Sequence, residues 1–394
     1  MKPASVIPRS IWMLGFVSLF MDVSSELIHG LLPVFMVSAL GASVFAVGVV
    51  EGFAEATALI VKVFSGVLSD YIGKRKFLAA IGYGLGALSK PLFALALTVN
   101  AVFAARFLDR IGKGIRGAPR DALIADLAPP EMRGAAYGLR QSLDTVGAFL
   151  GPLFGVALML YWAGDFRTVF WYAVIPASIA VLLLVFGVRE PGPGAPGRQP
   201  AAPIQWKALA DLSGTYWFVV AAGAVFALAR FSEAFLILRA QQQGLPNSYA
   251  PLVLVVMNVV YALSAYPLGK LADRVSHLAL LSAALLTLIF ADLILATAQG
   301  LAAVAAGVAL WGLHLGMTQG LFATMVADTA PAHLRGTAFG FFNLASGMAM
   351  LFASLLAGEL WDRFGDSATF YAGAVFALAA LLMLALRGRR SPGG

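Results

Sequence analysis

The stretch RFLDRIGKGIRGAPRDALIADLAPPEMRGAAYGLRQSLDTVGAFLGPLFG, from Arg106 to Gly155, decides the fold. It begins as an apolar helix with spaced charges, breaks into a charged loop at two prolines, and resumes as a helix built on glycines. Small residues four apart let two helix backbones approach closely inside a membrane, and a proline bends a helix. Gly147, Gly151 and Gly155 are four residues apart, Pro152 follows Gly151, and Gly138 lies nine residues before Gly147. The pattern predicts a tightly packed pair of membrane helices.

The composition of the chain assigns it to the membrane. Its 394 residues are 60% hydrophobic and 12% charged, whereas about 25% of the residues in a soluble domain are charged. An unpaired backbone amide in hydrocarbon costs several kcal/mol, so spanning segments are helices or closed barrels. Runs of about 20 apolar residues favour helices. The chain has no cysteine, which excludes a disulfide framework and a thiolate metal site.

The hydropathy pattern predicts an all-α membrane protein with twelve transmembrane helices. The expected spans are 11–37, 43–66, 77–98, 100–121, 135–160, 166–187, 214–238, 249–269, 277–297, 300–324, 336–358 and 367–387. Between the sixth and seventh spans lies REPGPGAPGRQPAAP, whose proline and glycine content is typical of an unstructured linker. The expected organisation is therefore a six-helix bundle at 1–188, a cytoplasmic linker at 189–212 and a second six-helix bundle at 213–394.

Basic residues outside the spans predict the orientation of the chain. Most of them fall on the side that holds both termini and the linker, and Arg167, Arg239 and Arg363 fall on the other. Because Lys and Arg accumulate in cytoplasmic loops, both termini are expected in the cytoplasm. The net charge of +7 thus reflects topology rather than nucleic-acid binding. We expect a multi-pass protein of the inner (cytoplasmic) membrane.

The two halves of the chain resemble each other in sequence. IADLAPPEMRGAAYG, from Ile124, matches VADTAPAHLRGTAFG, from Val326, at eight positions with an offset of 202 residues. GVLSD at Gly66 similarly matches GKLAD at Gly269. Parallel repeats of this kind build transporters whose substrate site lies near the bilayer midplane between the halves. The sequence therefore predicts two pseudo-symmetric bundles.

These repeated loops give the chain its resemblance to the major facilitator superfamily. The loop GVLSDYIGKRK is similar to the superfamily's cytoplasmic gate motif, although Tyr71 stands where a basic residue is usual and Ser276 replaces a glycine in the second copy. The resemblance assigns gate roles to Gly66, Asp70, Gly73, Lys74, Arg75, Asp273 and Arg274. It also implies the twelve-helix fold and transport of a small molecule.

The glycine pattern of the fifth span resembles the antiporter motif of exporters, with Val156 in place of its last glycine. In the same comparison, Arg106 matches an arginine of the fourth helix that the superfamily associates with proton coupling, and Arg110 fits a competing register. The resemblance implies that the first, fourth, seventh and tenth helices line a central cavity. It therefore points to the proton-coupled efflux branch.

Charged residues within the spans are the candidate functional groups, since each needs a partner, a cavity or a task in the bilayer. Asp22, Glu26 and His29 share one face of the first span. We expect Asp22, Glu26, Arg106 and Arg110 to couple proton movement to transport. Structural ion pairs are expected for Arg140 with Asp144 and for Arg230 with Glu233. The expected substrate cavity contains His29, Glu55, Asp109, Lys113, Arg230, Glu233, Tyr261, Trp311 and His314.

The most consistent interpretation is a proton-coupled antiporter that exports a small organic solute. One alternative is an importer or exchanger of organic anions that uses the basic stripe Arg106, Arg110 and Lys113. Another is a divalent-metal exporter, for which Asp22, Glu26 and His29 are weak candidate ligands. The sequence contains no phosphate-binding loop and no catalytic arrangement of Ser, His and Asp. We therefore expect no enzyme activity, no cofactor and no nucleic-acid partner, and a monomer whose partners are substrate, protons and membrane lipid.

Overall fold

The computed structural model describes residues 7–129, 132–189, 212–272, 274–318, 320–331 and 334–390, and the regular structure of these ranges is helical. The first part of the chain forms α1 (Arg9–His29), α2 (Leu32–Val34), the π-helix η1 (Phe35–Ala39), α3 (Val44–Ile72), α4 (Arg75–Leu95), α5 (Val99–Leu127), α6 (Arg133–Tyr161), α7 (Phe166–Tyr172), α8 (Val174–Leu182) and the π-helix η3 (Leu183–Gly187).

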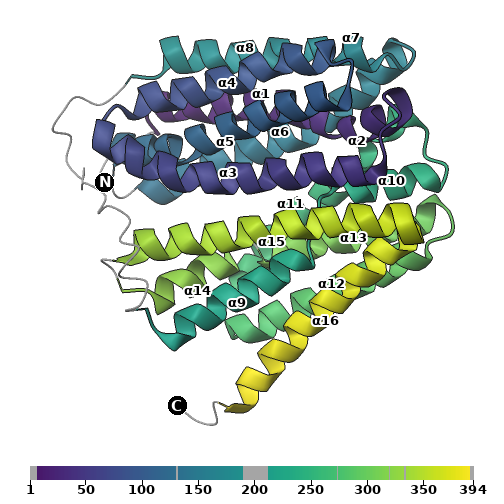
Figure 1. Ribbon diagram of the computed structural model, residues 1–394. Coiled ribbons are helices and arrows are strands. Elements are labelled where there is room, and N and C mark those ends of the chain that lie inside the picture. Colours follow the sequence, from purple (N-terminus) through teal and green to yellow (C-terminus); the bar gives the residue numbers. More distant parts are fainter. Residues whose placement is uncertain are drawn as a thin grey trace. The chain divides into compact units, whose positions relative to one another are not determined.

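The second part of the chain continues in the same way (Figure 1). It forms α9 (Gly214–Leu228), α10 (Ala234–Gln242), the 3₁₀-helix η5 (Asn247–Tyr249), α11 (Leu252–Ala272), α12 (His277–Thr297), α13 (Leu301–Thr318), α14 (Leu321–Thr329), α15 (Arg335–Phe364) and α16 (Asp366–Arg390). Most of the expected linker, residues 190–211, lies outside the described residues.

All twelve expected spans are helical over most of their length, and in the described residues 10 helices are long and apolar enough to cross a membrane. Two expected spans differ for separate reasons. The helix α5 is 29 residues long but carries many charges. The span expected at 214–238 is interrupted at residues 229–233, so that α9 alone is short. The expectation of one continuous helix over residues 214–238 is therefore wrong.

The internal repeat is confirmed by the helix boundaries. The helices α4 and α12 begin 202 residues apart, as do α5 and α13, and so do α6 and α15. In the second copy the long helix is divided into α13 and α14 at Gly320, whose φ of 77° lies in the left-handed region that glycine tolerates. A residue of these helices in the first half therefore corresponds to the residue 202 positions later in the second half.

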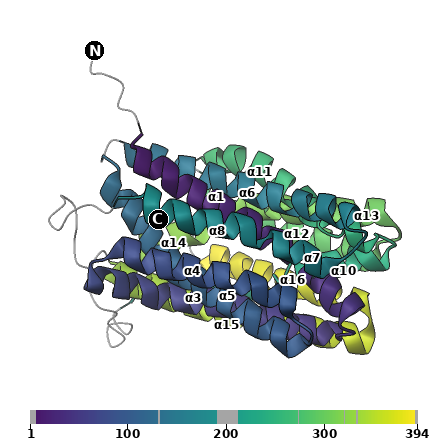
Figure 2. The ribbon, with the colours of Figure 1, turned by 90° about the horizontal axis from the view of Figure 1, so that it is seen from above.

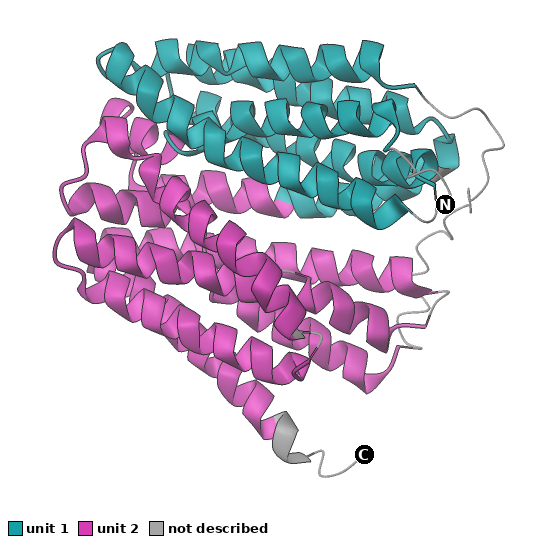
Figure 3. Ribbon diagram, turned by 180° about the vertical axis from the view of Figure 1, so that it is seen from behind, with its two compact units in different colours: residues 1–31, 57–203 teal, residues 32–56, 204–394 magenta. Residues whose placement is uncertain are grey.

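By its contacts the chain divides into two compact units, residues 1–31 with 57–203 and residues 32–56 with 204–394 (Figure 3). In unit 1, α4 lies against α5 and α1 against α6 (Figure 2). Its core combines Leu14, Val17 and Met21 of α1 with Tyr83 of α4 and Leu123 of α5, all fully buried. The predicted domain bounds, 1–188, 189–212 and 213–394, remain a prediction.

In unit 2 the first half of α3 packs closely on α15. A Cβ atom at Gly48 would lie 2.3 Å from the carbonyl oxygen of Ser354, and one at Gly358 would lie 2.7 Å from Cα of Phe45. The Asp362 carboxylate accepts hydrogen bonds from the amides of Val44 (3.1 Å) and Phe45 (2.9 Å). It therefore satisfies two amides that the start of α3 leaves without helical partners.

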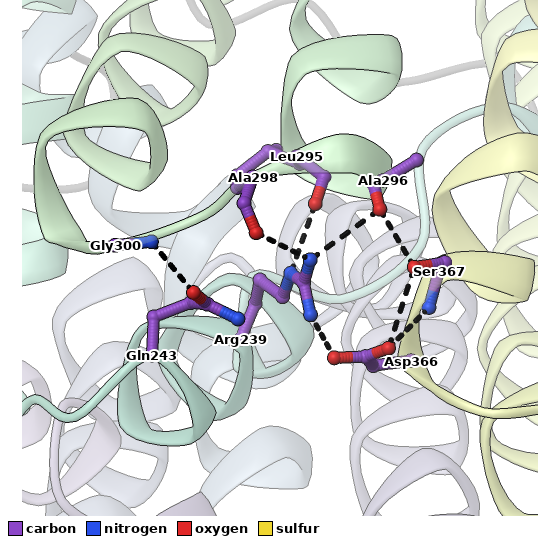
Figure 4. Close-up of polar contacts among 8 residues, drawn as sticks. All are labelled: Arg239, Gln243, Leu295, Ala296, Ala298, Gly300, Asp366 and Ser367. Atoms are coloured by element: carbon purple, nitrogen blue, oxygen red, sulfur yellow. Dashed lines mark hydrogen bonds and ion pairs between the residues drawn. The ribbon is translucent and has the colours of Figure 1, made fainter.

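One arginine joins three segments of unit 2 (Figure 4). The Arg239 guanidinium at the end of α10 donates to the carbonyl oxygens of Leu295, Ala296 and Ala298, and it forms an ion pair with Asp366 at the start of α16. These carbonyls belong to the end of α12 and the residue that follows it, where a helix leaves its last acceptors unsatisfied. Arg239 is 4% exposed, so these bonds are shielded from water.

We expect Arg239→Ala to destabilise the protein by about 3 kcal/mol, since the substitution leaves buried carbonyl acceptors without their donor and the partly buried Asp366 carboxylate without its cation. A lower melting temperature of the detergent-purified protein would report this loss. Arg363→Ala is the matched control, because Arg363 also pairs with a carboxylate, Glu359, but its side chain is 70% exposed and exposed pairs contribute little. Equal melting temperatures of the two variants would contradict the prediction.

Candidate functional site

The glycines of α6 bring this helix into backbone contact with α1. A Cβ atom at Gly147 would lie 2.6 Å from the carbonyl oxygen of Leu19 and 3.0 Å from Cβ of Asp22. One at Gly151 would lie 2.8 Å from the carbonyl oxygen of Val23 and 2.9 Å from Cβ of Glu26. Two glycines of the predicted pattern therefore pack against the turns of α1 that carry its two carboxylates.

The two carboxylates of α1 lie among charges from α5 and α6. Asp22 interacts electrostatically with Arg116 and Lys113 of α5 and with Asp144 of α6. Glu26 interacts with Lys113 and Arg110. Lys113 is thus shared between the two carboxylates. This cluster contains carboxylates of like charge beside several cations, a combination in which proton affinity depends on the distances between the groups.

Two further contacts complete this cluster. His29 lies one turn from Glu26, and its Nδ1 atom is 3.3 Å from Oε2 of Glu26. The predicted ion pair between Arg140 and Asp144 is present, four residues apart on α6. The structure therefore places His29 beside Glu26 on α1, and Asp22 and Glu26 beside basic residues of α5.

A second ion pair in unit 1 was not predicted from the sequence. The Lys90 ammonium of α4 donates to Oδ1 of Asp109 at 2.7 Å and to the Ser25 hydroxyl at 3.0 Å, and both charged side chains are almost completely buried. Arg110 lies 4.0 Å from the other oxygen of Asp109. Asp109, one of the expected cavity residues, is therefore paired with a lysine of the preceding helix.

The basic stripe of α5 continues beyond the residues expected from the sequence. Arg106 and Arg110 are 1% and 3% exposed, and Arg116 and Arg120 are also buried. The Arg116 guanidinium lies 4.9 Å above the Tyr83 ring, a cation–π contact. Arg120 Nη1 donates to the Ser18 hydroxyl at 3.2 Å. The regular spacing of arginines along α5 was the signal that could have identified both residues.

Unit 2 contains the other expected cavity residues. Arg230 interacts electrostatically with Glu233, Glu55 and Tyr261, and its guanidinium carbon lies 5.9 Å from the Phe226 ring centroid. The break between α9 and α10 therefore places Arg230 and Glu233 in irregular backbone. Broken helices of this kind form binding sites in transporters.

His314 and Trp311, also expected in the cavity, are fully enclosed. Nδ1 of His314 is 2.8 Å from the Ala284 carbonyl oxygen, and its ring stacks on Phe226 at 5.2 Å. Trp311 Nε1 donates to Oδ1 of Asp292 at 2.9 Å. The sequence analysis did not select Asp292, although it is a single charge in a strongly apolar span, a signal that could have identified it.

Comparison with known proteins assigns the family. The model of the Major Facilitator Superfamily matches residues 14–354 and, in a second overlapping match, residues 234–393. The chain belongs to the Major Facilitator Superfamily. It is therefore a multi-pass membrane transporter for small molecules and not an enzyme, and the predicted resemblance, fold and absence of enzyme activity are confirmed.

Individual relatives in the superfamily agree with this assignment. An uncharacterised MFS-type transporter of Methanocaldococcus jannaschii is 30% identical over 96% of this chain and 94% of its own. The multidrug resistance protein MdtH of Proteus mirabilis is 34% identical, over 35% of this chain and 34% of its own. A crystal structure of a POT family transporter in complex with 5-aminolevulinic acid has a TM-score of 0.80, at 13% identity, over 98% of this chain and 97% of that one.

The superfamily gate motif is ordered by an ion pair between distant segments. Nη1 of Arg75 lies 2.6 Å from Oδ2 of Asp126, which belongs to the repeated segment at the end of α5. Gly73 has a φ of 68°, which glycine tolerates. In the second copy Ser276 caps α12, because its hydroxyl accepts the Ala279 amide at 3.2 Å. By the offset of 202 residues between the helix starts, it lies at the position of Lys74, the residue before α4.

The remaining gate residues are only partly described. The side chain of Asp70 and the whole of Asp273 lie outside the described residues. Lys74 is the residue before α4, Gly66 lies on α3 opposite Ala118, and the Arg274 amide donates to the Leu271 carbonyl. Their predicted role in the gate remains a prediction.

In the part of the chain that the structure describes, no three His, Asp or Glu side chains are arranged to hold a metal ion. This includes Asp22, Glu26 and His29, the weak candidates from the sequence. The metal-exporter hypothesis therefore has no supporting site in the described residues.

We expect Gly151→Ala to lower the stability of the folded transporter by about 2 kcal/mol, since a side chain forced between packed backbones causes strain. Transport should fall as well, because α1 and its carboxylates would move. Gly138→Ala is the control on the same helix, since a Cβ atom there would meet nothing within 4 Å. Melting temperature and solute uptake in liposomes measure both effects, and a normal Gly151→Ala protein would contradict the packing argument.

Proposed function

We propose that this protein is a proton-driven antiporter that exports a small organic solute across the inner membrane. The observation that carries the proposal is the cluster of unit 1, where Asp22 and Glu26 lie beside Lys113, Arg110 and Arg116 at the crossing of α1 and α6. An ionised carboxylate in the bilayer is costly unless a cation lies close to it. Carboxylates with movable cationic neighbours therefore suit reversible proton binding.

The proposed cycle uses competition between a proton and a cation for the same carboxylate. When the cations of α5 lie close, Asp22 and Glu26 are held as carboxylates. When they move away, the proton affinity of a buried carboxylate rises and a proton binds. Lys113 interacts with both carboxylates, so its displacement would change the proton affinity of both at once. Substrate whose binding brings these cations back to the carboxylates would expel the proton and so exchange with it.

Two observations support export rather than import. The glycine pattern of α6 resembles the antiporter motif of exporters, and two of its glycines contact α1. A relative that covers about a third of the chain is named a multidrug resistance protein. The distribution of Lys and Arg supports cytoplasmic termini in the inner membrane. We also propose that the protein acts as a single chain.

Transport into liposomes that contain a pH-sensitive dye tests the proposal. Cationic, neutral and anionic solutes are screened with the wild-type protein for counterflow of protons. We expect Glu26→Gln and Asp22→Asn to abolish proton movement while solute still binds, because the neutral amides cannot exchange a proton. Glu359→Gln, which changes a carboxylate in an exposed pair with Arg363, is the control. Normal proton coupling in both cluster variants would refute the assignment.

A second candidate function is the exchange of organic anions. The observation that favours it is the buried basic stripe of α5, in which Arg106, Arg110, Arg116 and Arg120 accompany Lys113. Guanidinium groups bind carboxylates and phosphates through paired hydrogen bonds.

The two functions differ in how they respond to changes at Arg110. For an anion exchanger, we expect Arg110→Ala to abolish substrate binding, and Arg110→Lys to restore part of it because the charge returns without the paired geometry. For the proton antiporter, solute binding should persist in Arg110→Ala and only coupling should change. Binding of the transported solute, measured by calorimetry on both variants, distinguishes these outcomes.

A further inference from the structure

Asp292 is a buried carboxyl group that neither the superfamily nor the proposed proton cluster of unit 1 accounts for. It lies on α12 in unit 2 and is 0% exposed. One oxygen, Oδ1, accepts the Trp311 indole N–H at 2.9 Å. The other oxygen, Oδ2, has no hydrogen-bond partner among the described residues. A carboxylate in this state would carry a full charge with a single neutral donor.

The surroundings of Asp292 are apolar and aromatic. A Cβ atom at Gly373 of α16 would lie 2.5 Å from Oδ2 and 2.9 Å from the Phe231 ring, so the glycine leaves room for the carboxyl group. Phe231 lies in the break between α9 and α10, and its ring centroid is 5.6 Å from that of Trp311 and 5.5 Å from that of Phe370. The carboxyl group is therefore enclosed by the indole, the phenyl rings and the glycine backbone.

The internal repeat shows that Asp292 lacks the ion-pair partner found at the corresponding position in unit 1. With the offset of 202 residues, Asp292 corresponds to Lys90 and Trp311 corresponds to Asp109. In unit 1 these positions form the buried ion pair, in which Lys90 donates to Asp109 at 2.7 Å. In unit 2 the same contact between corresponding helices joins an indole donor to a carboxyl acceptor. The first copy is neutralised by its own partner, and the second has no cation at the corresponding position.

Other titratable groups near Asp292 are at the next turn of α13 and in the helix break. His314 follows Trp311 on α13, and its Nε2 atom has no hydrogen-bond partner in the described part of the chain. Arg230 and Glu233 flank Phe231 in the break, and Arg230 interacts electrostatically with both Glu233 and His314. The residue of α16 that packs on the carboxyl group is Gly373, which cannot titrate.

We propose that Asp292 is a second proton-binding site, which holds a proton on Oδ2 and exchanges it with water when the break at residues 229–233 rearranges. Burial of an ionised carboxylate without a cation costs several kcal/mol, so the enclosed group is the neutral acid. Opening of the break admits water, the Oδ2–H bond breaks, and the proton passes to that water. The admitted water solvates the carboxylate that remains. This inference rests on the proposed proton-driven function.

Infrared spectroscopy of the full-length protein in liposomes tests the site directly. A protonated carboxyl group gives a C=O stretching band that a carboxylate lacks, and the band shifts when the proton exchanges for deuterium. We expect a band in the wild-type protein that is absent from Asp292→Asn and that shifts within minutes in heavy water. Trp311→Phe should move the frequency of the same band, because the hydrogen bond to Oδ1 is lost.

Two infrared results would overturn the proposal. If Asp292→Asn leaves the carboxyl bands unchanged, Asp292 is ionised. If its band persists unshifted in heavy water for hours, the proton is fixed and the group is structural. Asparagine keeps an oxygen that can accept from Trp311, so a melting temperature near that of the wild type would show that the variant is folded. Should the variant not fold, the Trp311→Phe shift and the exchange rate in the wild type still decide.

Transport measurements separate this inference from the proposed function. If wild-type liposomes show no proton counterflow with any solute, the proposed function fails, whereas the infrared bands still decide the state of Asp292. If the wild type couples protons to transport, Asp292→Asn should lose part of the proton counterflow or alter its pH profile. Unchanged counterflow and pH profile in a folded Asp292→Asn protein would overturn proton transfer at this site.

Discussion

The close approach of α6 to α1 is the contact on which the candidate site depends. Because Gly147 and Gly151 have no side chains, the backbone of α6 reaches the turns of α1 that carry Asp22 and Glu26. This contact also brings Asp144 into electrostatic range of Asp22. With any larger residue the helices would separate, and the charged groups would lose the neighbours that make their burial tolerable. In unit 1, the close packing of α1 and α6 and the pairing of the buried charges therefore depend on the same contact.

The same constraint explains how a helix as charged as α5 is accommodated in the membrane. This helix is not among those apolar enough to cross a membrane by their hydropathy, yet its Arg106, Asp109 and Arg110 are almost completely buried. Their charges face protein rather than lipid, since Asp109 is paired with Lys90 and the stripe meets the carboxylates of α1. A charged face directed into a bundle is the usual arrangement for functional ionisable residues in membrane helices.

Local patterns predicted those parts of the structure that depend on spacing along one helix. The glycine spacing of α6, the pair Arg140–Asp144 and the repeat offset are all periodic, and each is present. The contact of Lys90 with Asp109 joins two helices, so no spacing within one helix could show it. The break before α10 contains no proline or glycine, and its aromatic packing around Phe231 is again a contact between segments.

The repeat connects these missed features, because two copies of one fold can distribute charge differently at equivalent positions. Lys90 and Asp109 form a complete ion pair in the first copy, and Asp292 with Trp311 replaces it by a carboxyl group and a neutral donor in the second. A closed ion pair holds its two helices together at every stage of a cycle. A carboxyl group with one neutral donor can instead change charge when its surroundings open. Phe231 of the broken helix is part of those surroundings. A movement of the break would therefore also displace one of the rings that enclose Asp292. The asymmetry between the copies therefore places a closed ion pair in unit 1 and, on our proposal, a titrating carboxyl group at the corresponding position in unit 2.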